Sequence, residues 1–256
     1  MLLQLKYEDA VAPIAQGSMA GSWDECSPRQ FNKLVALIDT EPQTEAELLK
    51  VYARALPVVC SLTKAQLSKL PDETIADLFE GLEWMAQPIV LTQSKARWAG
   101  LFTGPKDFLD NITMDEFGFA DAYFTAYMAS GERADLHRFI GQLYRPPLVP
   151  YTKGWLNDVW TWCARWYRPR RKRAMVANYL GLRANLVKRY PRVFRGGKGG
   201  SSRHGWQGVI AGMAVNLKDF EATARGNINN AMVLIDQSIE QSDKQEAELN
   251  KMRGKR

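Results

Sequence analysis

The chain has little of what metal sites and disulfide frameworks require. Its 256 residues include only three cysteines and two histidines. Cys26, Cys60 and Cys163 are far apart and form no C-x-x-C pair, so we expect buried thiols in a reducing compartment rather than disulfides. With His137 and His204 as the only imidazoles, a structural zinc site has almost no ligands, and the sequence predicts no cofactor and no metal.

Long apolar runs are also missing. No stretch of about 18 apolar residues occurs, so the sequence predicts no membrane-spanning helix and no membrane partner. The first ten residues, MLLQLKYEDA, turn acidic and lack the basic start and cleavage site of a signal peptide. An apolar fraction of 46% and a charged fraction of 24% are ordinary for a globular protein and argue against disorder throughout.

Motifs for nucleotide binding and nucleophilic catalysis are incomplete. Gly197-Lys198 is followed by Gly199 instead of Ser or Thr, and a helix end precedes it where a P-loop needs a strand. Ser61 to Lys64 matches S-x-x-K, but the companion motifs are missing and Thr63 is expected to cap a helix. The sequence therefore favours a basic loop at 196–205 over a phosphate site, and it predicts no enzyme.

Paired carboxylates are the remaining candidates for acid–base chemistry. Such work needs two carboxylates held in a cleft with separated pKa values, and these pairs suit helix N-terminal turns or solvated faces. His137 lies beside Arg138 with no evident nucleophile, which indicates a surface or boundary residue. The pairs are Asp115/Glu116, Asp107/Asp110 and Glu80/Glu83.

Helix signals recur along the chain. Ser27 with Gln30 and Thr113 with Glu116 have capping-box spacing. Apolar residues then follow at helical intervals. We expect a mainly α fold: an irregular multi-helix single domain of about eight to ten helices, with a minor β-hairpin and a protruding C-terminal helix.

The sequence also predicts the position of the hairpin, the place of Pro57 and the extent of the last helix. The hairpin is expected to pair 89–92 with 97–102, and Pro57 is expected to lie beyond the helix that begins at Thr44. One last helix is expected from near Asp219, with a polar end from Gln241 that protrudes and frays. The predicted divisions are an extended segment (1–22), a helical body (23–195), a Gly-rich basic loop (196–205) and a C-terminal helical region with a polar tail (206–256).

Positive charge is concentrated between Tyr151 and Arg203. This block holds fourteen Lys or Arg and one acidic residue, Asp158, a net charge of +13, although the whole chain carries +6. A concentrated positive face implies a polyanionic or acidic partner more strongly than a diffuse charge does. The basic partner-binding residues predicted here are Arg165, Arg168, Arg170, Arg171, Lys172, Arg173, Arg195, Lys198 and Arg203.

The same block is rich in tryptophan. Trp155, Val159, Trp162 and Trp166 recur at the spacing of one helical stripe, which favours burial of these side chains as packing residues. Three interpretations of the block stay open: protein docking, nucleic-acid contact, and an ordinary core with a solvated basic face. No RNA-binding sheet motif or C2H2 finger accompanies it, which favours protein docking over nucleic acid.

Three short segments, taken in order and spacing, carry a family resemblance. They are Ser22–Phe31 (SWDECSPRQF), Gln142–Pro146 (QLYRP) and Lys218–Glu221 (KDFE). Together they resemble uncharacterised proteins encoded in the tail-gene regions of phages and prophages of Bacteroidetes. Cys26 departs from that pattern, where a leucine-like residue is expected, with burial conserved.

The resemblance implies a viral protein with a tail structural or assembly role rather than catalysis. The expected function is therefore non-enzymatic virion assembly through contact between the basic face and acidic surfaces of other tail or assembly proteins. The host cytoplasm during assembly is the expected location, and the virion stays open. A nucleic-acid-binding role of the Arg-rich 165–203 block is the alternative, and oligomer formation is open as well.

Overall fold

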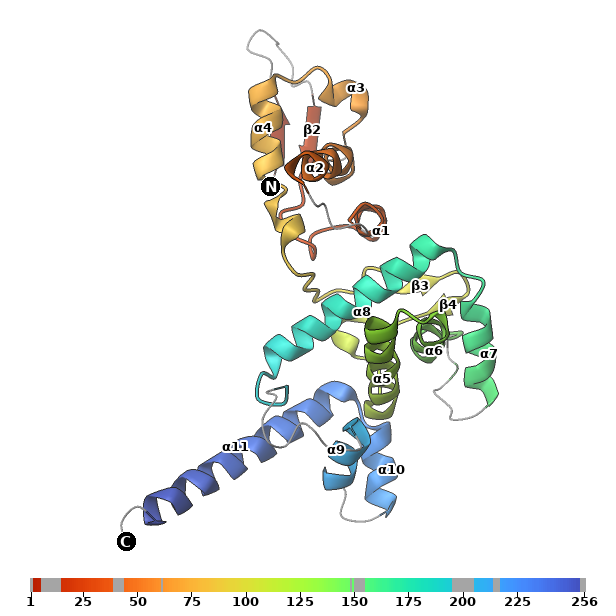
Figure 1. Cartoon of the computed structure of the whole chain (residues 1–256), viewed down its shortest axis with the longest axis vertical. Helices are drawn as coiled ribbons and strands as arrows, with labels where there is room; N and C mark the ends of the chain where they lie inside the picture. Colours follow the sequence, from red (N-terminus) through yellow and green to blue (C-terminus); the bar gives the residue numbers. More distant parts are fainter. Residues whose placement is uncertain are drawn as a thin grey trace. The chain divides into compact units, whose positions relative to one another are not determined.

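The computed structural model describes residues 2–5, 15–38, 44–60, 62–147, 149, 155–194, 205–213 and 217–253. Over these residues it has eleven α-helices, two short 3-10 helices and two antiparallel two-stranded sheets (Figure 1), which confirms the predicted mainly α fold with minor β structure. The chain divides into two compact units. The first unit comprises 1–96 and 168–181; the second comprises 97–167 and 182–256. The domain boundaries expected from the sequence stay a prediction.

The first unit is mostly helical and begins with a small sheet. In that sheet β1 pairs antiparallel with β2, Leu2 opposite Ser18 and Leu5 opposite Ala15. The unit also contains the first part of α8, from Pro169 to Gly181. Its other elements are β1 (Leu2–Leu5), β2 (Ala15–Ser18), α1 (Pro28–Val35), α2 (Glu45–Val59), α3 (Lys64–Leu67), α4 (Asp72–Glu80) and η1 (Glu83–Ala86).

The predicted cap of α1 is confirmed. The Ser27 side chain accepts from the Gln30 N–H, and the Gln30 side chain accepts from the Ser27 N–H. The Gln30 amide also donates to the carbonyls of Val58 (3.0 Å) and Val59 (3.2 Å), which ties the start of α1 to the end of α2.

Pro57 lies inside α2, so the prediction that it follows the helix is wrong. The helix continues to Val59, and the Cys60 N–H still bonds to the Leu56 carbonyl at 3.0 Å. Leu56, Val59 and Cys60 are all buried. Their packing outweighs the single hydrogen bond that proline removes from the last turn.

The predicted pairing of 89–92 with 97–102 is also wrong. The Leu91 N–H donates to the Gly181 carbonyl of α8 (3.0 Å) instead of to a strand. A little further along, the side chain of Asn178 accepts from the N–H groups of Lys95 (2.6 Å) and Ala96 (3.1 Å). Because α8 satisfies these backbone groups, 88–96 forms an irregular segment on that helix.

The second unit is built mainly around α5, α6 and α7. Its hairpin pairs Trp98 with Thr103 and Ala99 with Phe102, and Gly100 turns it at φ +68°. The unit also contains the last part of α8, Leu182–Arg189. Its elements are β3 (Trp98–Ala99), β4 (Phe102–Thr103), η2 (Asp107–Leu109), α5 (Met114–Ser130), α6 (Arg133–Leu143), α7 (Trp155–Ala164), α9 (Gly205–Met213), α10 (Leu217–Arg225) and α11 (Ile228–Arg253).

Two helices, α10 and α11, stand where the sequence predicts one. The helix is interrupted at Gly226-Asn227 because the backbone on both sides of Asn227 bonds to the residues at the start of α5. The Met114 N–H donates to the Gly226 carbonyl (2.9 Å) and the Ile228 N–H to the Ile112 carbonyl (3.0 Å). The Asn227 side chain accepts from the Asn229 N–H (2.8 Å) and so begins α11.

The second half of α11 has no packing of its own. Every side chain from Gln241 to Met252 is exposed, as expected for a protruding helix, and the helix extends to Arg253 (Figure 1). The predicted fraying of this end stays a prediction. Over the described ranges, no helix is long and apolar enough to cross a membrane.

Candidate protein-docking surface

Helix α7 and the turn that follows it present three tryptophans to solvent. Trp155, Trp162 and Trp166 are 72%, 55% and 75% exposed, so the prediction that this stripe packs in the core is wrong. We call these three residues the tryptophan face. Single exposed apolar residues need no explanation, but Trp162 and Trp166 contact each other with ring centroids 5.8 Å apart, so this face is the strongest candidate for a binding surface in the second unit.

The opposite side of α7 is the packed one. Phe102 of the hairpin contacts Trp160 edge-on (ring centroids 5.6 Å apart) and also contacts Tyr167 (6.2 Å). The Tyr167 hydroxyl donates to the Ala99 carbonyl at 3.3 Å. Ala164 is fully buried. The sequence shows two aromatic faces. The hairpin packs against the one that contains Trp160 and Tyr167, which has fewer tryptophans.

Helix α6 fixes α7 through a close crossing. A Cβ on Gly141 would lie 2.6 Å from the backbone nitrogen of Thr161 and 2.7 Å from its Cα, so only glycine permits this approach. With α6 on one side and the hairpin on another, the outward direction of the tryptophan face is set by rigid neighbours.

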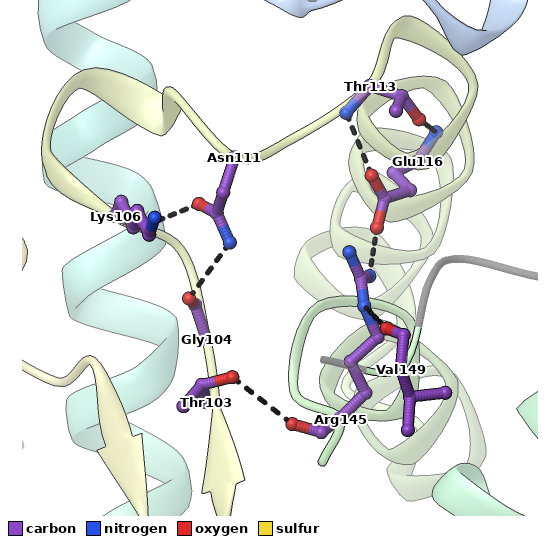
Figure 2. Close-up of polar contacts among 8 residues, drawn as sticks. All are labelled: Thr103, Gly104, Lys106, Asn111, Thr113, Glu116, Arg145 and Val149. Carbon is purple, nitrogen blue, oxygen red and sulfur yellow. Dashed lines mark hydrogen bonds and ion pairs between the residues drawn. The ribbon is translucent and has the colours of Figure 1, made fainter. Parts of the chain in front are cut away.

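The chain leaving α6 toward α7 is held by a buried ion pair (Figure 2). Arg145 donates through Nη1 to the fully buried Glu116 carboxylate and through Nε to the Val149 carbonyl at 3.0 Å. The other oxygen of Glu116 accepts from the Thr113 N–H at 2.8 Å, which completes the predicted capping box of α5. Glu116 therefore joins the start of α5 to the segment before α7.

The hairpin is also bonded to Arg145. The Thr103 N–H donates to the Arg145 carbonyl (2.8 Å) and the Arg145 N–H to the Thr103 carbonyl (3.1 Å), and the Thr103 hydroxyl adds a third contact. Asn111 continues the network by accepting from the Lys106 N–H (2.6 Å) and donating to the Gly104 carbonyl (3.3 Å; Figure 2). These polar groups support the surface and offer no reactive pair, because each is bonded to backbone or to an opposite charge.

The predicted basic residues fall into three groups. Arg165 is exposed in the second unit, and five others lie in the first unit at the start of α8. Arg195, Lys198 and Arg203 lie outside the described residues. We call the five residues at the start of α8 the basic segment: Arg168, Arg170, Arg171, Lys172 and Arg173.

The basic segment occupies an electrostatically unfavourable place. The Arg168 carbonyl accepts from the N–H groups of Arg171 (2.9 Å) and Lys172 (3.2 Å), so these cations are in the first turn, where the helix dipole is positive. That turn contains no acidic residue. Arg170 also donates from Nε to the Asn32 carbonyl (3.2 Å). The helix dipole therefore opposes this clustering of positive charge.

The hairpin turn carries exposed apolar residues that the sequence analysis missed. Trp98 and Leu101 are exposed, with the Arg97 guanidinium 5.9 Å from the Trp98 ring centroid. The available signal was a large apolar residue directly after Gly100, since a hairpin turn directs its side chains toward solvent. The tryptophan face and this turn lie on different sides of α7, because Phe102 packs against the opposite face of that helix.

The residues suited to chemistry are not gathered. No cluster of metal-ligating side chains occurs within the described ranges. Burial raises the pKa of the Cys60 thiol to about 11, and burial together with the nearby Glu25 raises that of Cys26 to about 11 despite the opposing charge of Lys95. These thiols are protonated at neutral pH and are poor nucleophiles or metal ligands.

Comparison with known proteins adds no relative: no family model, no curated protein and no solved structure matches this chain. The fold and the exposed surfaces therefore define only the class, a mainly α protein with an aromatic surface on α7 and the turn after it.

Proposed function

We propose that this chain is a non-enzymatic structural or assembly component of a tailed-phage or prophage tail, acting by protein–protein contact. The observation that supports this most is the exposure of Trp155, Trp162 and Trp166 along α7 and the turn after it, while another side of that helix packs against the hairpin. Trp and Arg are the residues most enriched among interface hot spots. The tail setting comes from the sequence resemblance alone.

Charge supports an acidic partner surface. Arg165 lies next to Trp166 in the chain, and the basic segment adds five cations in the first unit. Positive surfaces of this kind steer encounter and fix register more than they add affinity. We therefore assign affinity to the tryptophan face and partner selection to Arg165, and we treat the basic segment as a separate basic surface of the first unit.

Ring geometry favours a protein over a single-stranded nucleic acid as the occupant. Bases stack on aromatic platforms with open ring faces. Trp162 and Trp166 instead meet edge to face, with centroids 5.8 Å apart and planes at 69°. A knobbed surface of this kind suits interdigitating protein side chains better than a series of stacked bases.

The test uses purified proteins encoded by the genes adjacent to this one. Trp162→Ala with Trp166→Ala should raise the Kd for an acidic neighbour at least about 30-fold, because each truncation removes hot-spot contact area. Trp98→Ala is the matched control, since Trp98 is similarly exposed (58%) in the same unit, and it should change the Kd less than about threefold.

Two further arms decide between partner classes. Duplex DNA at low micromolar affinity, with log K falling steeply against log salt, would replace the docking proposal with the nucleic-acid alternative. Tryptophan-dependent binding to anionic lipid vesicles would assign the face to a membrane surface and would also overturn it. Equal Kd values for Trp98→Ala and the double variant would show that the tryptophan face is not the docking site.

A further inference from the structure

The first unit carries equal numbers of positive and negative charges, and the two signs lie on different elements. Residues 1–96 contain eight Lys or Arg and thirteen Asp or Glu, whereas 168–181 contain five cations and no acid, so the unit is neutral. A net charge near zero promotes association, because no long-range repulsion keeps two copies apart. Separated charges of both signs also give such a unit two unlike surfaces.

Helix α1 extends the basic segment. Arg170 donates through Nε to the Asn32 carbonyl of α1 at 3.2 Å, which holds the start of α8 against that helix. Lys33 follows Asn32, and Arg29 lies one helical turn before Lys33 on the same face. Both side chains are exposed, and no Asp or Glu occurs from residue 26 to residue 38. We call the basic segment together with Arg29 and Lys33 the basic surface.

Helix α4 carries the opposite charge on one face. Glu73, Asp77 and Glu80 follow one another at intervals of four and three residues, and all three are exposed. Leu78 is buried on the opposite side of the helix. No Lys or Arg occurs from residue 70 to residue 94, and no ion pair joins the three carboxylates to a cation among the described residues. We call these three residues the acidic face.

Each surface places charge where its own helix does not favour it. Glu80 is in the last turn of α4, where the helix dipole is negative and no basic residue is present. Arg29 is in the first turn of α1, where the dipole is positive and no acidic residue is present. Like charges four residues apart on a helix also repel, as Glu73 and Asp77 do. Arg29 and Lys33 repel in the same way. A partner surface of opposite charge would offset both effects.

We propose that the acidic face of one copy binds the basic surface of a second copy. Charge complementarity selects this partner, because the chain itself supplies both exposed surfaces. The pairs Arg29/Lys33 and Glu73/Asp77 have the same four-residue spacing, so they can lie opposite one another. Since the two surfaces differ, the contact is heterologous, and its repetition makes a ring or an open filament.

This contact goes beyond the proposed function, because it uses only the first unit and not the tryptophan face of the second. Ion pairs between exposed side chains are individually weak and are screened by salt. We therefore expect association at high protein concentration and low ionic strength. Burial of apolar surface is not screened in this way, so salt dependence separates this contact from one made by the tryptophans.

The experiment uses the full chain and charge-reversed variants. Arg29→Glu with Lys33→Glu reverses part of the basic surface, and Asp77→Lys with Glu80→Lys reverses part of the acidic face. A fourfold variant carries all four changes and keeps the net charge of the unaltered chain. All four side chains are exposed, so folding should be retained, and far-ultraviolet circular dichroism checks this.

The matched control is Lys50→Glu with Arg54→Glu on α2. Both residues are exposed, lie in the same unit and have the same four-residue spacing. They lie on the side of α2 opposite Tyr52, which contacts Phe79 of α4 with ring centroids 6.3 Å apart. The control therefore makes the same change of charge away from the acidic face.

Sedimentation velocity gives the readout. At about 20 mM salt the unaltered chain and the control should increase in average mass as concentration rises toward about 200 µM, and at about 500 mM salt both should be monomeric. Each double variant should associate at least about tenfold more weakly, because like charges then face each other. The fourfold variant should recover most of the association, since its reversed surfaces attract again.

Four results would overturn the inference: an unaltered chain that stays monomeric at low salt, association that persists at high salt, double variants that associate as well as the control, or a fourfold variant that does not recover. Trp162→Ala with Trp166→Ala should leave this association unchanged, because the contact lies in the first unit. Loss of self-association in that variant would assign the contact to the tryptophan face instead. Failure of this inference is thus distinguishable from failure of the proposed function.

Discussion

At the scale of single residues, the Glu116–Arg145 pair has the largest predicted effect on stability. The Glu116 side chain is fully buried and that of Arg145 is 15% exposed. Arg145→Met leaves an unpaired buried carboxylate and should lower the free energy of unfolding by about 3–5 kcal/mol. Urea denaturation followed by circular dichroism measures this change.

The matched control for this prediction is the double variant Glu116→Met with Arg145→Met. It removes both charges and should cost distinctly less than Arg145→Met alone, because desolvation offsets most of the attraction within a buried pair. If the single and double variants lose equal stability, the contribution is packing rather than charge.

Asp24 gives a second prediction, on pH dependence. Burial alone would raise its pKa, but hydrogen bonds from the Thr92 hydroxyl and the Gln93 and Thr92 N–H groups, with the charge of Lys95, lower it below 3.8. A depressed folded-state pKa adds stability above the unfolded value and loses it as the pH falls through the folded value. Asp24→Asn should therefore cost about 1–2 kcal/mol at pH 7, and that difference should narrow as the pH falls below about 4.

Unfolding curves at several pH values test the Asp24 prediction. Thr92→Val is the companion variant, because it removes one hydroxyl donor and should move the acid loss of stability to higher pH. A difference between Asp24→Asn and the unaltered chain that stays constant from pH 7 to pH 3 would contradict it.

Sequence reasoning at the residue scale succeeds where the partners are close in the chain. Ser27 with Gln30 and Thr113 with Glu116 form the predicted caps because each needs only a three-residue spacing. The ion pair of Glu116 with Arg145 was not predicted. The two residues are 29 positions apart, and no local sequence pattern indicates that contact.

At the scale of elements, the crossing of α6 and α7 depends on Gly141. Exposed Gly→Ala changes within helices usually stabilise by up to about 1 kcal/mol. Here a Cβ would meet the Thr161 backbone at 2.6 Å, so Gly141→Ala should instead destabilise by roughly 1–3 kcal/mol. The sign of the change in melting temperature decides the matter, and a stabilised variant would contradict the crossing.

Element boundaries show why local patterns have limits. The apolar spacing from Phe220 to Ile239 is continuous and predicts one helix, yet the backbone bonds of Gly226 and Ile228 to the residues at the start of α5 interrupt it. Likewise, periodicity finds the stripe of Trp155, Trp162 and Trp166 but not which side of α7 faces the hairpin. The docking role of the block stays a prediction, while three of its tryptophans change from predicted core residues to surface residues.

At the scale of the whole molecule, the three cysteines differ in burial between the two units. Cys26 and Cys60 are buried in the first unit near the bonds of Gln30 to α2, whereas Cys163 is half-buried in the second. With pKa values of about 11, only about one in a thousand of the thiols Cys26 and Cys60 is ionised at pH 8. An aromatic disulfide reagent should therefore modify Cys163 first, and Cys26 and Cys60 together in one slower phase set by opening of their shared core. Peptide mapping by mass spectrometry measures each rate, Cys163→Ser should remove only the fast phase, and separate slow rates for Cys26 and Cys60 would contradict a shared core.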